Sequence, residues 1–200
     1  DKMFLACFGD NVQASAGAGS SDAIVREAEA AIAVFEPSQD DGGLATAYRM
    51  LAWAHGTEGR YGVAAEAAQH AIEHADRAGD TRQHLRASTL YALSALHGPT
   101  PASEAIERCR QIVEDVAGDR RAEGLVTIVL GWLEAMRGDF DAAREHARRG
   151  RAILDDLGTN VLAASTVSSE IEMLAGDPAA AERDLRRDYD ALTELGETYL

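Results

Sequence analysis

The residues best placed to do chemistry are two histidines and a glutamate in the string HAIEH. His70, Glu73 and His74 follow the H-x-x-E-H order found in some zinc-dependent hydrolases. Residues four apart lie one turn apart on a helix, so both imidazoles could reach one zinc ion. However, no third ligand is marked by its spacing, and Glu66, His70 and His74 also form a polar stripe typical of a solvated helix face. The solvated face is the favoured interpretation, and a zinc hydrolase is the less favoured alternative.

Other catalytic and cofactor patterns are weak. Lys2 is the only lysine among 19 basic residues, which removes the phosphate-binding lysine of P-loops and Schiff-base catalysis. The other histidines, His55, His84, His97 and His146, have no Ser or Cys partner at a recognisable spacing. The string AGAGSS contains a lone GxG with no strand before it, which favours a loop. We therefore predict a protein that is not an enzyme and needs no cofactor or metal.

Charge and cysteine content narrow the class of partner. The chain has 34 acidic and 19 basic residues and a net charge of −15, which disfavours nucleic acid and anionic membranes as direct partners. No apolar run approaches the roughly 18 residues that span a bilayer, and the opening DKMFLACF is too short for a secretory signal. Cys7 and Cys109 are far apart and are expected to be reduced thiols. We predict a cytoplasmic protein that binds a protein, a peptide or other domains of the same polypeptide.

The elements that would position these residues are helices. Alanine fills 39 positions, aromatic residues make up only 6% and there are four prolines, so helix formers dominate over strand formers. Glycines recur at regular intervals, in one series at Gly79, Gly118, Gly158 and Gly196 and in a second at Gly59, Gly138 and Gly176. Glycine at these points ends a helix in the left-handed conformation, and the Asp or Thr that often follows caps the next helix. Two stops in each period of about 39 residues indicate repeated helix pairs.

The 3.6-residue periodicity between these stops predicts an all-α fold. The expected helices cover 22–36, 43–57, 61–78, 81–97, 102–116, 120–137, 140–157, 159–175 and 178–195, with a further short helix at 2–8. The expected domains are an irregular segment at 1–21 and a repeat domain at 22–200 of about four and a half helix pairs. Because the chain begins without Met and ends just after the Gly196 stop, we expect a fragment of a larger protein, cut within its repeats.

Two copies of one pattern connect the chain to a known family. LAWAHGTEGRY at residues 51–61 returns 79 residues later as LGWLEAMRGDF at residues 130–140. With the alanines that follow, Ala64 and Ala143, this pattern resembles the tetratricopeptide (TPR) repeat, although these repeats exceed the usual length of about 34 residues. The resemblance implies an α-solenoid, a superhelix of stacked antiparallel helix pairs with a concave groove. Ala64, Ala143 and Ala181 are then expected where the two helices of a pair approach closely.

A narrower resemblance concerns the last third of the chain. MRGDFDAAREHARRGRAILDDLG, followed by LAGDPAAAERDLRRDYDALTELGETYL, is similar to the C-terminal repeats of large actinobacterial regulators. Those proteins combine such repeats with a cyclase-like or LuxR-type DNA-binding domain and a signalling ATPase module. The resemblance implies a non-catalytic interaction or sensing module of a bacterial signalling or transcriptional regulator. Nothing in the chain itself indicates a cyclase or an ATPase.

The candidate binding residues follow from the groove that this family shares. In TPR-like arrays the first helix of each pair lines the groove, which would bring Arg49, Trp53, Trp132 and Glu170 toward a bound peptide or helix. The competing interpretation places both tryptophans in the core. Two alternatives stay open: a small-molecule sensor that closes its groove or the HGPTPAS elbow over a metabolite, and pairing of two copies into a homodimer.

One further cluster is basic. Arg144, Arg148, Arg149 and Arg151 lie on one helix flank and could meet an acidic partner. The favoured interpretation pairs them with nearby carboxylates such as Glu145, Asp155 and Asp156, at a few tenths of a kcal/mol each.

Overall fold

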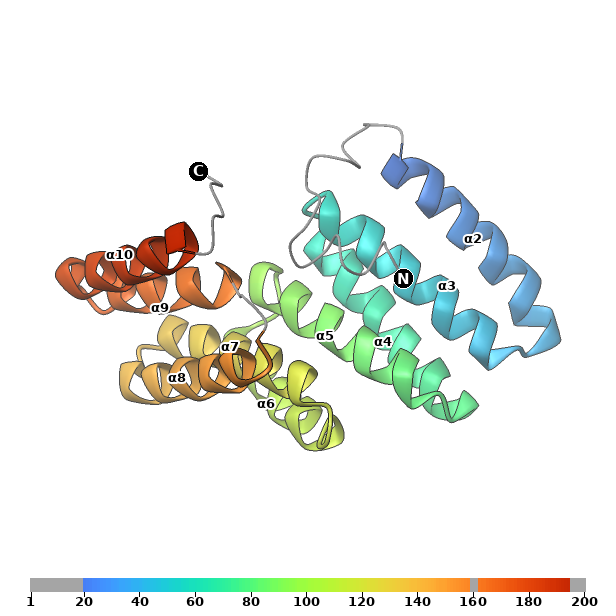
Figure 1. Cartoon of the computed structure of the whole chain (residues 1–200). Helices are drawn as coiled ribbons and strands as arrows, with labels where there is room; N and C mark the ends of the chain where they lie inside the picture. Colours follow the sequence, from blue (N-terminus) through green and yellow to red (C-terminus); the bar gives the residue numbers. More distant parts are fainter. Residues whose placement is uncertain (1–19, 159–161, 195–200) are drawn as a thin grey trace. The chain divides into compact units, whose positions relative to one another are not determined.

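The computed structural model describes residues 20–158 and 162–194, and this part of the chain is built from helices alone (Figure 1). The helices are α2 (Ser20–Ser38), α3 (Asp41–Thr57), α4 (Tyr61–Ala78), α5 (Thr81–His97), α6 (Ala102–Asp115), α7 (Arg120–Met136), α8 (Phe140–Asp156), α9 (Leu162–Leu174) and α10 (Pro178–Glu194). The all-α prediction is confirmed for these residues, and most helix ends fall within two residues of their predicted positions. The predicted helix at 2–8, the predicted start of a helix at 159 and the Gly196 stop lie outside the described residues.

The glycine stops behave as predicted. Six of the seven glycines that were expected to end helices lie in the described residues, and all six have positive φ: Gly59, Gly79, Gly118, Gly138, Gly158 and Gly176. The aspartates after four of them cap the next helix, as where the Asp80 carboxylate accepts a hydrogen bond of 3.0 Å from the backbone N–H of Gln83. Asp119, Asp139 and Asp177 make the equivalent bonds.

The first connection departs from the prediction. The helix α2 begins at Ser20, inside the segment expected to be irregular, and α3 begins at Asp41 rather than 43. The left-handed residue between them is Gln39, with φ of 52°, and Asp40 caps α3. Gly43 is therefore inside the first turn of α3, where a Cβ atom would lie 2.7 Å from the Phe35 ring. Glycine is needed here for close packing between α2 and α3, which the local sequence does not reveal.

The helices form two compact units, which divide between Pro101 and Ala102, at the HGPTPAS elbow. In the first unit α2 packs on α3, α3 on α4 and α4 on α5, and α3 also contacts α5. In the second unit α6 packs on α7, α7 on α8, α8 on α9 and α9 on α10, and α7 also contacts α9. Each helix thus packs on helices near it in the sequence. A single repeat domain over 22–200 stays a prediction.

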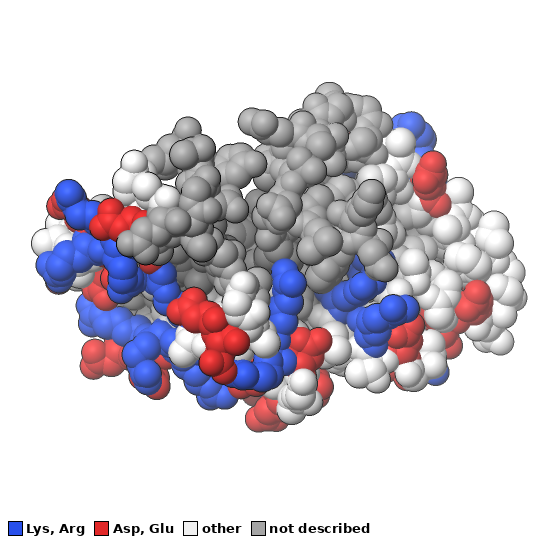
Figure 2. Space-filling view, viewed as in Figure 1, with Lys and Arg blue, Asp and Glu red and all other residues white. Residues whose placement is uncertain are grey.

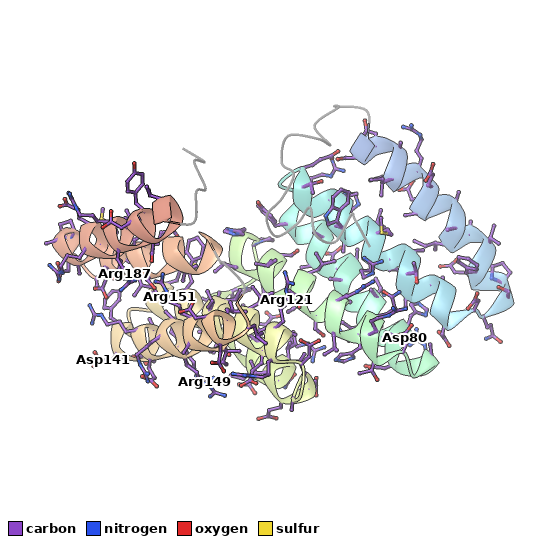
Figure 3. All side chains as sticks on the ribbon, in the orientation of Figure 1. Asp80, Arg121, Asp141, Arg149, Arg151 and Arg187 are labelled. Atoms are coloured by element: carbon purple, nitrogen blue, oxygen red, sulfur yellow. The ribbon has the colours of Figure 1, made fainter. Side chains whose placement is uncertain are left out.

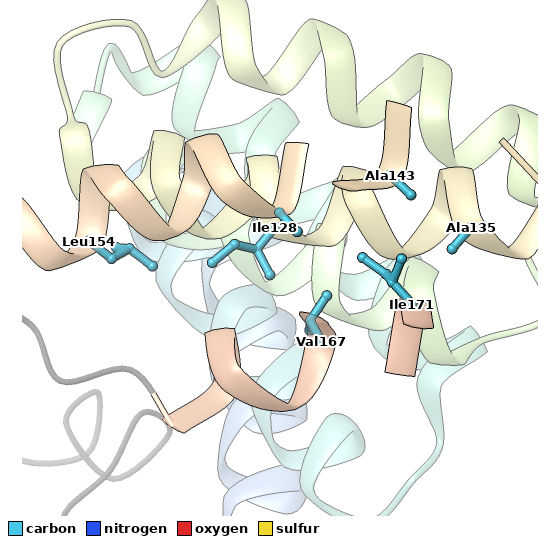
Figure 4. Packing of buried hydrophobic residues seen from close by; sticks show 7 residues of the cluster. Ile128, Ala135, Ala143, Leu154, Val167 and Ile171 are labelled. Carbon is cyan, nitrogen blue, oxygen red and sulfur yellow. The ribbon is translucent and has the colours of Figure 1, made fainter. Parts of the chain in front are cut away.

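The cores of both units rely on small residues. In the second unit Ile171 of α9 lies beside the small Ala135 and Ala143 of the α7–α8 pair, and Val167 lies nearer Ile128 of α7 (Figure 4). In the first unit one core cluster contains Ala52, Ala67, Ala68 and Leu90. Ala64, Ala143 and Ala181, which were predicted to lie at close approaches, are at most 3% exposed. None of the described helices is long and apolar enough to cross a membrane.

Candidate functional site

The predicted groove residue Arg49 lies on α3 in the first unit and is joined to α5. Its Nε donates a hydrogen bond of 2.7 Å to Oε1 of Gln83, which is itself almost buried. The side-chain amide of Gln83 in turn donates to the Thr46 hydroxyl at 3.2 Å. Gln83 therefore connects two side chains of α3, three residues apart, to the start of α5. Gln83 was not predicted as a binding residue. Its position as the third residue after the cap Asp80 places it in the first turn of α5, beside Arg49 and Thr46.

The two tryptophans pack against the hydrophobic cores of their units. Trp53 of α3 is partly buried and packs against the cluster that contains Ala52, Ala68 and Leu90. Trp132 of α7 is partly buried against the cluster of the second unit. These contacts fit the core interpretation for the buried part of each side chain. Arg49 and Trp53 belong to one unit and Trp132 and Glu170 to the other, so one groove that holds all four stays a prediction.

Glu170 of α9 is in an unusual position for a carboxylate. It is partly buried, and its Oε2 atom is fully buried without a hydrogen-bond partner in the described structure. Burial raises the pKa of the Glu170 carboxyl above its ordinary value of 4.5. Glu172, two residues on, has the opposite environment, because hydrogen bonds of 2.8 and 2.7 Å from Arg144 lower the pKa of its carboxyl.

These environments predict opposite effects for two matched substitutions. The raised pKa means that the folded state holds the Glu170 proton more tightly than the unfolded state does, so ionisation of this carboxyl costs stability as the pH rises above 4.5. Glu170→Gln is therefore expected to increase the free energy of unfolding near neutral pH, and the gain should disappear in acid. Glu172, with its lowered pKa, stabilises the fold above its ordinary pKa, so Glu172→Gln is expected to decrease the free energy of unfolding near neutral pH. Urea unfolding at about pH 4 and about pH 7 checks both signs, and a loss of stability in Glu170→Gln at neutral pH would contradict the first.

The HAIEH string folds onto a surface of the first unit beside the start of α3. Nδ1 of His74 lies 2.7 Å from a carboxylate oxygen of Asp41, and Nη2 of Arg77 is 2.8 Å from the same nitrogen. His74 stacks on Tyr48 with ring centres 5.5 Å apart, and His70, which is exposed, also faces this ring. The hydrogen bonds from His74 and Arg77 hold the pKa of the Asp41 carboxyl below its ordinary value.

This arrangement gives the zinc alternative no support. The aromatic ring of Tyr48 lies against both His70 and His74, and His74 is held by Asp41. In the described ranges no three His, Cys, Asp or Glu side chains are grouped so that they could hold a metal ion. Cys109 is buried, and burial raises the pKa of its thiol to about 12, which does not suit a nucleophile.

The arginine cluster of α8 is paired, and mostly with other helices. Arg148 pairs with Glu145 on its own helix, but Arg144 pairs with Glu172 of α9 and Arg149 with Glu123 of α7. Basic and acidic side chains accordingly interleave over α8 and α10 (Figure 2). The interpretation that these arginines pair with carboxylates is confirmed, and two of the suggested partners, Glu145 and Asp155, do pair with the cluster. The third, Asp156, pairs instead with Arg120 of α7.

A charged cavity of about 290 Å³ lies where α8, α9 and α10 meet. Arg151 and Arg187 lie between α8 and α10 (Figure 3), and both contact the buried Asp188 carboxylate. The lining arginines are Arg144, Arg148, Arg151 and Arg187. Each of them has a carboxylate partner, so the cavity has no excess of unpaired positive charge. A small-molecule ligand stays a prediction, and the cavity does not favour an anion.

The chain matches no known family model and no curated protein sequence. Its function is therefore inferred from its own residues and their packing.

Proposed function

We propose that this chain is a non-catalytic interaction module, a TPR-like stack of antiparallel helix pairs that binds a peptide or protein segment. Following the resemblance of its repeats, we place it in a bacterial signalling or transcriptional regulator. The observation that carries the proposal is the packing order. In each unit every helix packs on its sequence neighbours, and the first helices of successive pairs contact each other, α3 with α5 and α7 with α9. This order is the one expected where repeats hide apolar surface only between neighbours.

The helix ends support the same proposal. Positive-φ glycines end helices in both units, and aspartate caps follow several of them, in the series predicted from the repeats. Neighbouring repeats built in one way present their first helices side by side, and a stack of such helices offers an extended binding surface. Shape and fixed side chains, rather than reactive groups, would then provide affinity.

Arg49 is the side chain that we expect to contribute most to binding on this surface. It is partly exposed on α3, and the 2.7 Å hydrogen bond to Gln83 restricts the orientation of its guanidinium group. A side chain that is already ordered loses less entropy when a partner binds. Arginine is also among the residues that most often dominate binding energy at interfaces. A peptide with carboxylate or carbonyl acceptors would suit it.

Selection from a displayed random-peptide library on the 200-residue chain tests this proposal. We expect enriched peptides whose affinity falls about tenfold or more in Arg49→Ala, as is typical of a dominant interface residue. Arg82→Ala changes an exposed arginine on α5 and is the matched control, which should bind like the parent. Fluorescence anisotropy measures the affinities, and circular dichroism confirms that both variants are folded. Failure to enrich any peptide, or equal binding by Arg49→Ala, would contradict the proposed groove.

A further inference from the structure

Two crevices between paired helices are filled by the helix that follows them. The crevice between α3 and α4 is covered by α5, which contacts both helices and contributes Ala87 and Tyr91 to the packing. The crevice between α7 and α8 is covered by α9, which contacts both and contributes Val167 and Ile171 (Figure 4). In both cases the covering helix presents two apolar residues that are four positions apart, and so on one face.

The third crevice, between α9 and α10, has no covering helix among the described residues. It has a volume of about 550 Å³ and is lined mainly by Ser169, Met173, Pro178, Ala181, Leu185 and Tyr189; we call it the end crevice. Gly138 and Gly176 precede α8 and α10 and are 38 residues apart, so Ala181 and Leu185 correspond to Ala143 and Ala147.

Exposure distinguishes the end crevice from its filled counterpart. Ala143 and Ala147 are at most 5% exposed beneath α9, whereas Leu185 is 48% exposed. Met173 and Tyr189 are also exposed, at 60% and 51%. Large apolar side chains gathered in one exposed concave site usually mark a contact surface. The two filled crevices indicate that the matching shape is a helix.

The rim of the end crevice differs in charge from that of the filled crevice at one equivalent position. Beside the filled crevice, Arg144 of α8 holds Glu172 of the covering helix, the residue directly after Ile171. The corresponding residue of α10 is the acidic Glu182, which pairs with Arg186 on the same helix, and both residues line the end crevice. The charge at this point of the rim is thus reversed. A covering helix would match it with a basic residue where α9 has Glu172.

We propose that the end crevice is a docking site for an amphipathic helix of a partner protein. The helix carries two aliphatic residues four positions apart, followed directly by Arg or Lys. The aliphatic pair enters between Met173 and Leu185, and the basic residue pairs with Glu182. This inference rests on the proposed repeat organisation, but it concerns a different surface from the Arg49 groove.

The test uses synthetic helical peptides and the full chain. The probe has the α9 sequence Leu162–Leu174 with Glu172→Arg, stapled on the side opposite Val167 and Ile171, and the control peptide keeps Glu172. We expect Leu185→Asp to weaken binding of the probe by about tenfold or more, since an apolar contact is lost and a charge is placed in the crevice. Glu182→Arg should reverse the preference between the two peptides, by about two- to fivefold as for exposed ion pairs. Val34→Asp, at an exposed apolar residue of α2, should bind like the parent.

Three outcomes would overturn the inference: no binding of the probe, equal binding by Leu185→Asp, or a dimer that Leu185→Asp dissociates in analytical ultracentrifugation. The last would assign the end crevice to a second copy of the chain. Arg49→Ala separates this inference from the groove. It should leave probe binding unchanged even where selected groove peptides no longer bind.

Discussion

Gly150→Ala is expected to destabilise the second unit by about 3 kcal/mol, at the upper end of the usual cost of overpacking. A Cβ atom at residue 150 of α8 would lie 2.7 Å from the carbonyl oxygen of Gly124 and 3.0 Å from the backbone nitrogen of Ile128, both on α7. Backbone atoms cannot move aside as a flexible side chain can, so the two helices must separate. Their separation would loosen the core that also receives α9.

Tryptophan fluorescence during urea unfolding measures this effect, because each unit has one of the two tryptophans. In a Trp53→Phe background, Trp132 reports on the second unit alone. The matched control is Gly56→Ala on α3, followed by Trp53 in a Trp132→Phe background. A Cβ atom there comes no closer than 4.0 Å to the side chain of Ala64, so the better helix propensity of alanine should stabilise the first unit by up to about 1 kcal/mol. Unchanged stability in Gly150→Ala would show that α7 and α8 do not approach this closely.

Arg110→Ala is expected to cost about 2 to 3 kcal/mol, because it leaves a buried charge without its main partner. The Glu134 side chain on α7 is only 2% exposed, and its carboxylate accepts a hydrogen bond of 2.7 Å from Arg110 of α6. Arg137 is 3.9 Å away and compensates only partly. The pair also joins α6 to α7, so α6 should loosen first.

A double-mutant cycle separates the buried charge from the loss of the arginine itself. Combining Arg110→Ala with Glu134→Gln should recover part of the lost stability, because a neutral amide is less costly to bury than a carboxylate. Arg148→Ala removes the partner of Glu145 in an exposed ion pair and should change stability little. If Arg110→Ala behaves like Arg148→Ala in urea unfolding followed by Trp132, the Glu134 carboxylate is not buried in solution.

Helix ends could be predicted because their causes are local. A glycine such as Gly79 takes positive φ without a steric cost, and an aspartate such as Asp80 caps the next helix within three residues. The helix expected from residue 43 begins at Asp41, because Asp40 caps α3 by accepting a hydrogen bond from the backbone N–H of Gly43. Gly124, Gly131 and Gly150 were not predicted to matter, because the atoms that crowd them belong to the neighbouring helix and not to their own stretch of sequence. Glycine inside a helix is costly, so these positions could have been suspected of close packing.

For the predicted binding residues, too, the helix could be predicted from the sequence but the contacting partner could not. The repeat pattern located Arg49 and Trp53 on the first helix of a pair, because position within a repeat is a local property. Residues of α5 that complete their surroundings, Gln83 for Arg49 and Leu90 in the cluster against Trp53, lie more than 30 residues along the chain.

Local sequence therefore determines where the helices of this protein begin and end and which of their faces are apolar. The choice of partner across helices belongs to the tertiary structure. Arg144 makes its two shortest contacts with Glu172 of α9, Glu134 is buried beneath Arg110, and the end crevice has no covering helix among the described residues while its counterpart is filled. The physical reason is the separation along the sequence over which each interaction acts. A cap or a glycine turn involves only a few neighbouring residues. An ion pair or a filled crevice depends on the distance between helices, which packing alone decides.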